Sequence, residues 1–233
     1  MVKALIALAS YNGKFYDDGA NTGVFFVEAS HPYEYFEKNG VDVTFVSETG
    51  KFGWDEHSLS TDFLQGDDRK VYENPDSSFM KAVKTVKKAS EVNPADYDIF
   101  FAAGGHGAAF DFPTATDLQK LYLAIWEKNG VVAGVCHGPC IFENARGSDG
   151  EYFLKGKKAT GFTDEGEKIM KIDHIMTELK LKTPRQGIEA CGGSYVQPPD
   201  AWGSFTVTDG KFITGVNPAS AVETAEKALK ALA

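Results

Sequence analysis

The chain has 233 residues, of which 42% are hydrophobic and 24% are charged, and its formal net charge at pH 7 is -9. This length and composition suit a sizeable core, and we expect a single α/β domain over residues 1–233. The negative charge and the lack of a basic stripe argue against nucleic acid and anionic membranes as partners. Small molecules or proteins are the expected partners.

The N-terminus and the cysteines indicate an intracellular protein. Residues 4–9 are apolar but too short for a signal peptide, and no segment approaches the ~18 apolar residues of a membrane span. Three cysteines are an odd and sparse set that does not suit a disulfide framework. We expect the protein in the cytoplasm, with the nucleus as a further compartment.

Strands and helices alternate along the chain. The patterns predict strands at residues 3–9, 41–46, 97–102, 131–135 and 157–162, and a hairpin with an Asp-Gly turn at 205–215. They predict helices from about residue 22 to 35 with Thr22 as cap, at 79–89, 116–129, 164–180, briefly from 183, and at 218–232. Short connections between alternating elements predict a doubly wound sheet.

One strand ends at a cysteine. Residues 131–135 have the continuous apolar character of a strand buried on both faces, and Cys136-His137-Gly138-Pro139 follows as a turn into a helix. Such an elbow exposes a side chain at the carboxyl end of a parallel strand, where open α/β sheets place their sites. The positive end of the following helix also favours thiolate, so we expect Cys136 to be a nucleophile rather than an inert buried thiol.

A cysteine nucleophile needs a base, a carboxylate that orients the base, and donors for an oxyanion. His137 is the candidate base because it adjoins Cys136. The backbone N–H groups of Gly105 and His137 are candidate donors, since the glycine-rich segment 104–107 ends a neighbouring strand. Three acids in the segment after the next strand could orient the histidine, and spacing does not distinguish them: Asp164, Glu165 and Glu167.

Glu28 and His106 are further candidates. Glu28 lies among apolar neighbours in the first predicted helix, where a raised pKa would let it share a proton with a cysteine or a substrate oxygen. A position on the helix surface fits the same pattern equally well. His106 is expected to bind substrate together with Gly105, or only to satisfy backbone groups.

The other cysteines and histidines offer little. Cys140, one helical turn after Cys136, fits core packing better than a resolving thiol, and Cys191 has no visible partner. The five histidines are scattered, and no Cys-x-x-Cys or His-x-x-x-His spacing occurs, so we expect no metal site. We also expect no cofactor, because no cofactor motif is convincing.

Several of these motifs occur together in one known family. Ala133-Gly134-Val135-Cys136-His137-Gly138-Pro139 and Gly104-Gly105-His106-Gly107, with an apolar-flanked Glu28, resemble the ThiJ/PfpI superfamily. Residues 46–58, 161–167 and 214–220 are similar to its fungal branch of glutathione-independent glyoxalases, or glyoxalase III, also described as heat-shock chaperones. The likeness runs from about Lys3 to the final helix.

The resemblance implies a flavodoxin-like fold, with helices on both faces of a mostly parallel sheet, and usually a homodimer. It implies Cys136 as nucleophile, His137 as its partner, Glu167 as the acid that orients His137, and Glu28 as proton shuttle. The chain departs from the family pattern at two places. Cys140 stands where such proteins usually carry alanine, which leaves a redox role open, and residues 144–152 differ, which leaves the substrate preference of the pocket rim open.

The reaction that the resemblance implies converts small 2-oxoaldehydes, methylglyoxal to lactate and glyoxal to glycolate, without glutathione or metal. Cys136 adds to the aldehyde, Glu28 or His137 moves a proton through an enediol, and water hydrolyses the thioester.

Other functions could use the same cysteine. A class I amidotransferase normally needs a late His-x-Glu, whereas His174 has Met176 two positions on. A cysteine peptidase would depend on a particular oligomer, and a protein deglycase would share the nucleophile. The strongest alternative of another class is a holding chaperone for misfolded clients, or an oxidative-stress sensor that works through Cys136.

Overall fold

The computed structural model describes residues 1–232. A seven-stranded sheet with the order β10-β11-β7-β6-β1-β4-β5 forms its centre. Neighbouring strands are parallel except for the antiparallel hairpin of β10 and β11. The strands are β1 (Lys3–Ala7), β4 (Asp42–Ser47), β5 (Lys87–Lys88), β6 (Ile99–Ala102), β7 (Val131–Val135), β10 (Thr206–Asp209) and β11 (Phe212–Gly215).

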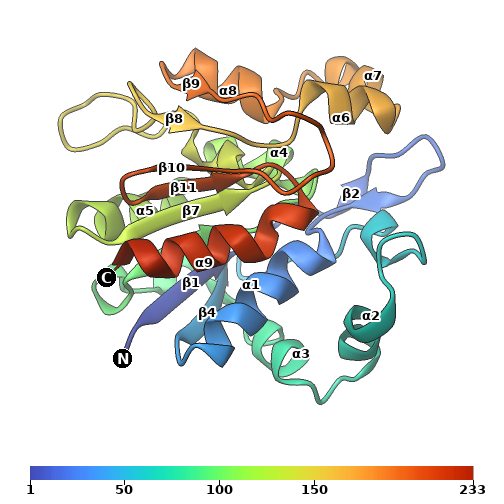
Figure 1. The fold of residues 1–233 in the computed structure, drawn as a ribbon, viewed down its shortest axis with the longest axis horizontal. Coiled ribbons are helices and arrows are strands. Elements are labelled where there is room, and N and C mark those ends of the chain that lie inside the picture. Colours follow the sequence, from blue (N-terminus) through green and yellow to red (C-terminus); the bar gives the residue numbers. More distant parts are fainter. Residues whose placement is uncertain (233) are drawn as a thin grey trace.

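Helices cover both faces of this sheet (Figure 1). α1 (Phe26–Lys38) and α9 (Ala221–Leu232) pack against each other on the face turned toward the viewer, and α5 (Thr116–Glu127) lies behind β6 and β7. The remaining helices are α2 (Gly66–Glu73), α3 (Ser78–Val83), α4 (Gly107–Asp111), α6 (Asp164–Ile169), α7 (Asp173–Glu178) and α8 (Pro184–Ala190). The expected flavodoxin-like, doubly wound fold is confirmed.

The order of the strands determines where a crevice can form. From β1 the chain builds outward to β4 and β5, and then returns to the other side of β1 to build β6, β7 and β11. In open α/β sheets a crevice forms beyond the carboxyl ends of the strands, where the direction of winding reverses. Every residue of β6 and β7 is buried, which anchors the loops that follow these two strands.

Two small sheets lie outside the central one. β2 (Gly13–Lys14) and β3 (Asn21–Thr22) form an antiparallel hairpin, and β8 (Lys158–Ala159) pairs in parallel with β9 (Ser194–Tyr195). The strand predicted at 157–162 therefore shrinks to two residues and does not join the central sheet. Its Thr160 N–H instead donates to the Thr214 hydroxyl of β11 at 2.8 Å.

The helix predicted at 79–89 is wrong beyond residue 83. Lys87 and Lys88 form β5, which pairs with Val46 and Ser47 at the edge of the central sheet. Backbone hydrogen bonding to β4 outweighs a weak helical pattern, and exposed lysines are typical of protected sheet edges.

Residues 164–180 also form two helices rather than one. Lys171 adopts a positive φ of 57°, and the N–H of Ile172 donates to the carbonyl of Glu167 at 3.0 Å. This six-to-one bond is a Schellman-type ending that terminates α6 before α7 begins.

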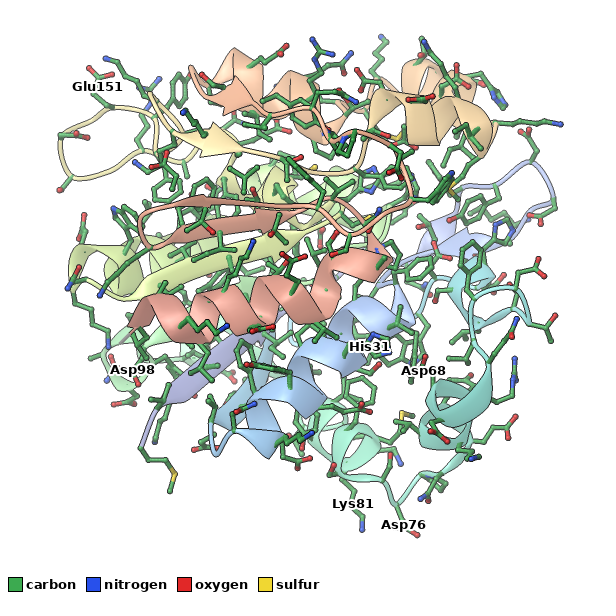
Figure 2. The ribbon with its side chains drawn as sticks, in the orientation of Figure 1. His31, Asp68, Asp76, Lys81, Asp98 and Glu151 are labelled. Atoms are coloured by element: carbon green, nitrogen blue, oxygen red, sulfur yellow. The ribbon has the colours of Figure 1, made fainter. Side chains whose placement is uncertain are left out.

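The first helix begins later than predicted, at Phe26. Thr22 is not its cap but belongs to β3, where its hydroxyl donates to Asp55 at 2.7 Å. The sequence patterns also missed α2, which has no buried residue. A hydrogen bond of 2.8 Å between His31 of α1 and Asp68 of α2 links the two helices (Figure 2).

The helix that the elbow pattern predicts after β7 is a five-residue 3-10 helix, η5 (Gly138–Phe142). Within residues 1–232, no helix has both the length and the apolar character needed to cross a membrane.

Candidate functional site

Cys136 occupies a sharp turn directly after β7. Its φ of 59° lies in the left-handed region, which costs a residue with a side chain about 1–2 kcal/mol. Backbone bonds hold the turn, since the Cys136 N–H donates to Gly215 at 3.0 Å and its carbonyl accepts from Phe162 at 2.9 Å. The predicted strand and sharp turn are therefore present, and they hold the thiol at the carboxyl end of the sheet.

A chain of contacts runs from this thiol to one carboxylate. The Cys136 sulfur lies 3.4 Å from His137 Nδ1, and His137 Nε2 lies 2.7 Å from Glu167 Oε1. Thr163 caps α6 by accepting a hydrogen bond from the Gly166 N–H, which places Glu167 in the first turn of that helix. Of the three acids left open by spacing, Glu167 is the one that contacts His137 in the described chain.

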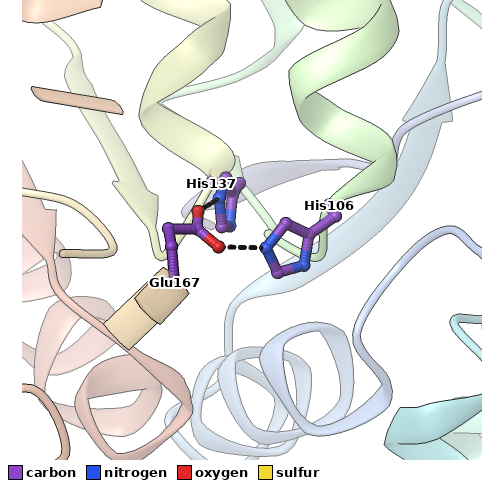
Figure 3. A group of neighbouring side chains, drawn as sticks. All are labelled: His106, His137 and Glu167. Atoms are coloured by element: carbon purple, nitrogen blue, oxygen red, sulfur yellow. Dashed lines mark hydrogen bonds and ion pairs between the residues drawn. The ribbon is translucent and has the colours of Figure 1, made fainter. Parts of the chain in front are cut away.

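The same carboxylate holds a second histidine. His106 Nε2 lies 2.9 Å from Glu167 Oε2, and the two imidazole centroids are 4.0 Å apart (Figure 3). The Nε2 atoms and the carboxylate lie within 4.8 Å of one another, a spacing that could also hold a metal ion. Two of the histidines that are scattered in the sequence, His106 and His137, thus lie together in the structure. The scatter of the histidines is therefore no longer an argument against a metal site.

Electrostatics define the protonation of this group. Burial alone would raise the pKa of Glu167, but His106 and His137 hold it well below its usual range. Burial lowers the pKa of His137, helped by His106 and opposed by Glu167. A neutral His137 therefore donates its Nε2–H to an ionised Glu167, and the lone pair on Nδ1 faces the thiol.

Glu28 is fully buried in the first turn of α1, so the surface alternative for this residue is wrong. Neither of its carboxylate oxygens has a hydrogen-bond partner in the described chain. A Cβ on Gly104 would lie 2.2 Å from Glu28 Oε2 and 2.8 Å from the Cβ of Cys136, so only glycine leaves room for both. Burial raises the pKa of Glu28 well above its ordinary value, and the neighbouring Cys136 thiol and Gly104 amide offset only part of this effect.

The free Cys136 thiol differs from the thiolate expected from the elbow pattern. Burial raises its pKa well above the ordinary value, the charge of Glu28 adds to this, and the Gly105 amide opposes it. η5 has only five residues, which is too short to supply the expected helix dipole, and it cannot offset the loss of hydration. Ionisation of Cys136 must therefore be coupled to proton transfer.

Gly105 lies between the sheet and the start of α1. Its φ is +100°, and an added Cβ would lie 2.3 Å from the Gly23 carbonyl and 2.6 Å from the Phe25 nitrogen. This conformation brings its backbone close to the Cys136 sulfur, in line with the effect of its amide on the thiol.

A small, mostly apolar cleft opens above these groups. It is lined by Cys136, Glu28, Gly105 and His106, and no sequence motif identified most of the other walls, since they come from distant segments. These walls are Tyr16, Phe25, Phe63, Phe162, Met170, Trp202 and Pro218.

The loop at residues 47–58 acts on the cleft through Tyr16. The Tyr16 hydroxyl donates to Asp55 Oδ2 at 2.7 Å, and Asp55 is fully buried. Asp55 also accepts from the Ser58 N–H at 3.0 Å. A buried carboxylate thus fixes the position of an aromatic wall of the cleft.

Comparisons with known proteins show relatives over nearly the whole chain. A model of the DJ-1/PfpI family matches residues 20–231. The chain is 53% identical to Glyoxalase 3 of Candida albicans, covering 99% of this chain and 98% of that protein, and 50% identical to glutathione-independent glyoxalase HSP31 of Saccharomyces cerevisiae, with the same coverage.

Two solved structures extend the comparison. The crystal structure of glyoxalase III from Candida albicans superimposes with a TM-score of 0.97, covering 99% of this chain and 97% of that chain, at 53% identity. The Rapid Encystment Protein 24 kDa of Francisella tularensis superimposes with a TM-score of 0.88, covering all of both chains, at 26% identity.

Proposed function

The chain belongs to the DJ-1/PfpI family, as the motifs around Cys136 indicated, and we propose that it is a glutathione-independent glyoxalase. Its substrates are small 2-oxoaldehydes, with methylglyoxal converted to lactate and glyoxal to glycolate. The fungal relatives that carry this activity in their names cover nearly the whole chain.

The observation that carries the proposal is the thiol–imidazole–carboxylate chain next to an unpaired buried acid. Cys136, His137 and Glu167 are in contact at 3.4 and 2.7 Å, and Glu28 adjoins them without a partner of its own. This set provides a nucleophile, its base, a carboxylate for the resulting imidazolium, and a separate proton carrier.

The reaction begins with addition to the aldehyde. His137 Nδ1 takes the thiol proton as the Cys136 sulfur bonds to the aldehyde carbon, and Glu167 stabilises the imidazolium. The Gly105 and His137 N–H groups receive the developing oxyanion. Protonation of that oxygen gives a hemithioacetal.

An internal redox step follows. The proton on the former aldehyde carbon moves, through an enediol, to the neighbouring carbonyl carbon, with Glu28 as the principal carrier. The ketone oxygen gains a proton as the enediol forms, and the hydroxyl of the former aldehyde loses one as the thioester carbonyl forms. The aldehyde carbon is thereby oxidised to a thioester, and the ketone is reduced to an alcohol. Water then cleaves the carbon–sulfur bond, which releases lactate and the thiol. The electrons balance within one substrate molecule, so this route needs neither glutathione nor a nicotinamide.

Lactate formation from methylglyoxal, in a buffer without glutathione or added metal, tests the proposal. We expect the wild type and Cys140→Ala to form lactate and Cys136→Ala to form none, because Cys140 is a buried cysteine of η5 outside the cleft lining. Circular dichroism confirms that each variant is folded. Lactate at the wild-type rate from Cys136→Ala, or none from folded wild type, would reject the proposal.

Three further expectations belong with this function. We propose a homodimer, a cytoplasmic location with the nucleus as a second compartment, and binding of misfolded clients as a separate role. All three cysteines are free, which is compatible with a reducing compartment. Suppression of client aggregation by Cys136→Ala would separate the client-holding role from turnover.

A further inference from the structure

His106 lies in a position for which the reaction above has no explicit task. It lines the cleft together with Cys136 and Glu28, and it is 5% exposed. Its only side-chain hydrogen bond within residues 1–232 joins Nε2 to Glu167 at 2.9 Å. A residue that served only to hold Glu167 would not need to face the cleft.

The bond to Glu167 determines which ring nitrogen is free. Because the two histidines hold the pKa of Glu167 low, the carboxylate is ionised and accepts from an N–H at His106 Nε2. In a neutral ring the lone pair is then on Nδ1. Figure 3 shows this second nitrogen of His106 turned away from Glu167.

Aromatic contacts fix the plane of the ring. Phe15 stacks on His106, with centroids 5.1 Å apart and planes 26° apart, and Phe162 meets it edge-on at 6.0 Å. The free nitrogen is thus held in one orientation, as a proton acceptor in catalysis must be.

One carboxylate therefore orients two imidazoles in the same tautomer. His137 Nδ1 is engaged by the sulfur of Cys136 at 3.4 Å, whereas His106 Nδ1 has no hydrogen-bond partner within residues 1–232, and the His106 side chain lines the cleft. The proposed reaction needs a base for the thiol at its start and a base for the water that cleaves the thioester at its end.

We propose that His106 is the general base for thioester hydrolysis, a role that rests on the glyoxalase function proposed above. Nδ1 takes a proton from water as the water oxygen bonds to the thioester carbon. The carbon–sulfur bond then breaks, and the electron pair stays on the Cys136 sulfur. The proton on His106 returns to the sulfur directly or through solvent, which restores both groups.

His106→Gln separates this role from mere positioning. The glutamine amide can reach the place of Nε2 and keep a donor to Glu167, but it has no basic nitrogen. We expect kcat to fall by about 10²-fold or more, the usual contribution of a general base. Rapid mixing with methylglyoxal should show a burst of substrate consumption, and mass spectrometry should find a lactoyl group on Cys136. Added imidazole should partly restore turnover.

The matched control is His174→Gln, which removes an exposed histidine that pairs with Asp17 outside the cleft. We expect wild-type kcat and no lactoyl adduct. If His106→Gln does not fold, His106→Asn provides a second side chain without a basic nitrogen.

The outcomes distinguish this inference from the proposed function. No lactate from the wild type would reject the glyoxalase function itself. An active wild type with an equally active His106→Gln would overturn the role of His106. Loss of turnover in His106→Gln without an adduct, together with slower alkylation of Cys136 by iodoacetamide, would mean that His106 only positions Glu167.

Discussion

The substitution Glu167→Gln tests the shared carboxylate most directly. The change keeps the size of the side chain but removes its charge. Glu167 accepts hydrogen bonds from two buried imidazoles at 2.7 and 2.9 Å. A glutamine has only one acceptor oxygen, so it can accept from one imidazole N–H and must turn its NH2 group toward the N–H of the other imidazole. One histidine must then change its tautomer or leave its N–H unpaired.

The magnitude follows from the charge that His137 acquires. A hydrogen bond to a charged group contributes about 1.5–3 kcal/mol. This bond speeds the reaction only to the extent that it stabilises the transition state, in which His137 becomes an imidazolium, more than the ground state. Loss of that stabilisation lowers kcat/KM by about 10- to 150-fold, at about 1.4 kcal/mol for each factor of ten. The free energy of unfolding at pH 7 should also fall, by about 2–5 kcal/mol for the two buried bonds together.

The assay is lactate formation over a range of methylglyoxal concentrations, combined with urea unfolding. Glu165→Gln is the matched control, since Glu165 is an exposed acid in the same turn of α6. We expect wild-type kinetics and stability for this control. A folded Glu167→Gln protein with kcat/KM within twofold of wild type would refute the importance of the shared carboxylate.

Three other substitutions probe the surroundings of the thiol and one distant acid. Glu28→Gln should lower kcat by about 10²-fold or more with a smaller change in KM, because an amide cannot carry the proton; wild-type kcat would contradict this. Gly104→Ala should abolish turnover and lower the thermal midpoint of unfolding, since its Cβ would lie 2.2 Å from Glu28 Oε2; a fully active variant would show that the site can relax. Burial raises the pKa of Asp111 from 3.8 to about 6, so the folded state keeps a proton that the unfolded state releases, and stability falls as pH rises through this window. At 1.36 kcal/mol per pKa unit, the wild type loses about 3 kcal/mol at most of its free energy of unfolding through this group. Urea unfolding at pH 4 and pH 7 should therefore show a smaller fall in the free energy of unfolding for Asp111→Asn than for the wild type, by up to that amount. Equal falls in the two proteins would contradict the assignment.

Local patterns predicted the parts of the fold that depend on neighbouring residues. Residues 131–135 form a strand with the predicted bounds, because a continuous apolar run of this length is stable only between two covering layers. The hairpin of β10 and β11 is also present as predicted, with Gly210 and Lys211 as the two turn residues after Asp209. By contrast, β5 and β8 are two residues long, which is too short to give a periodic signal.

The site was predictable as a set of candidates but not as an arrangement. His137 adjoins Cys136 in the sequence, so their contact is local. His106 and Glu167 are 61 positions apart, and no local pattern encodes their bond. The protonation of Cys136 was predicted incorrectly because burial depends on the whole fold, whereas the dipole argument used only the following turn.

The positive φ of Cys136 has a consequence for sequence change at this position. Glycine adopts that conformation without strain, so Cys136→Gly recovers part of the 1–2 kcal/mol or so that the left-handed backbone costs a larger residue. Deleting the buried Cys136 side chain also removes packed atoms, and this loss opposes the gain. The melting temperature of a variant at this position therefore does not report whether the nucleophile is kept, and only an assay of turnover does.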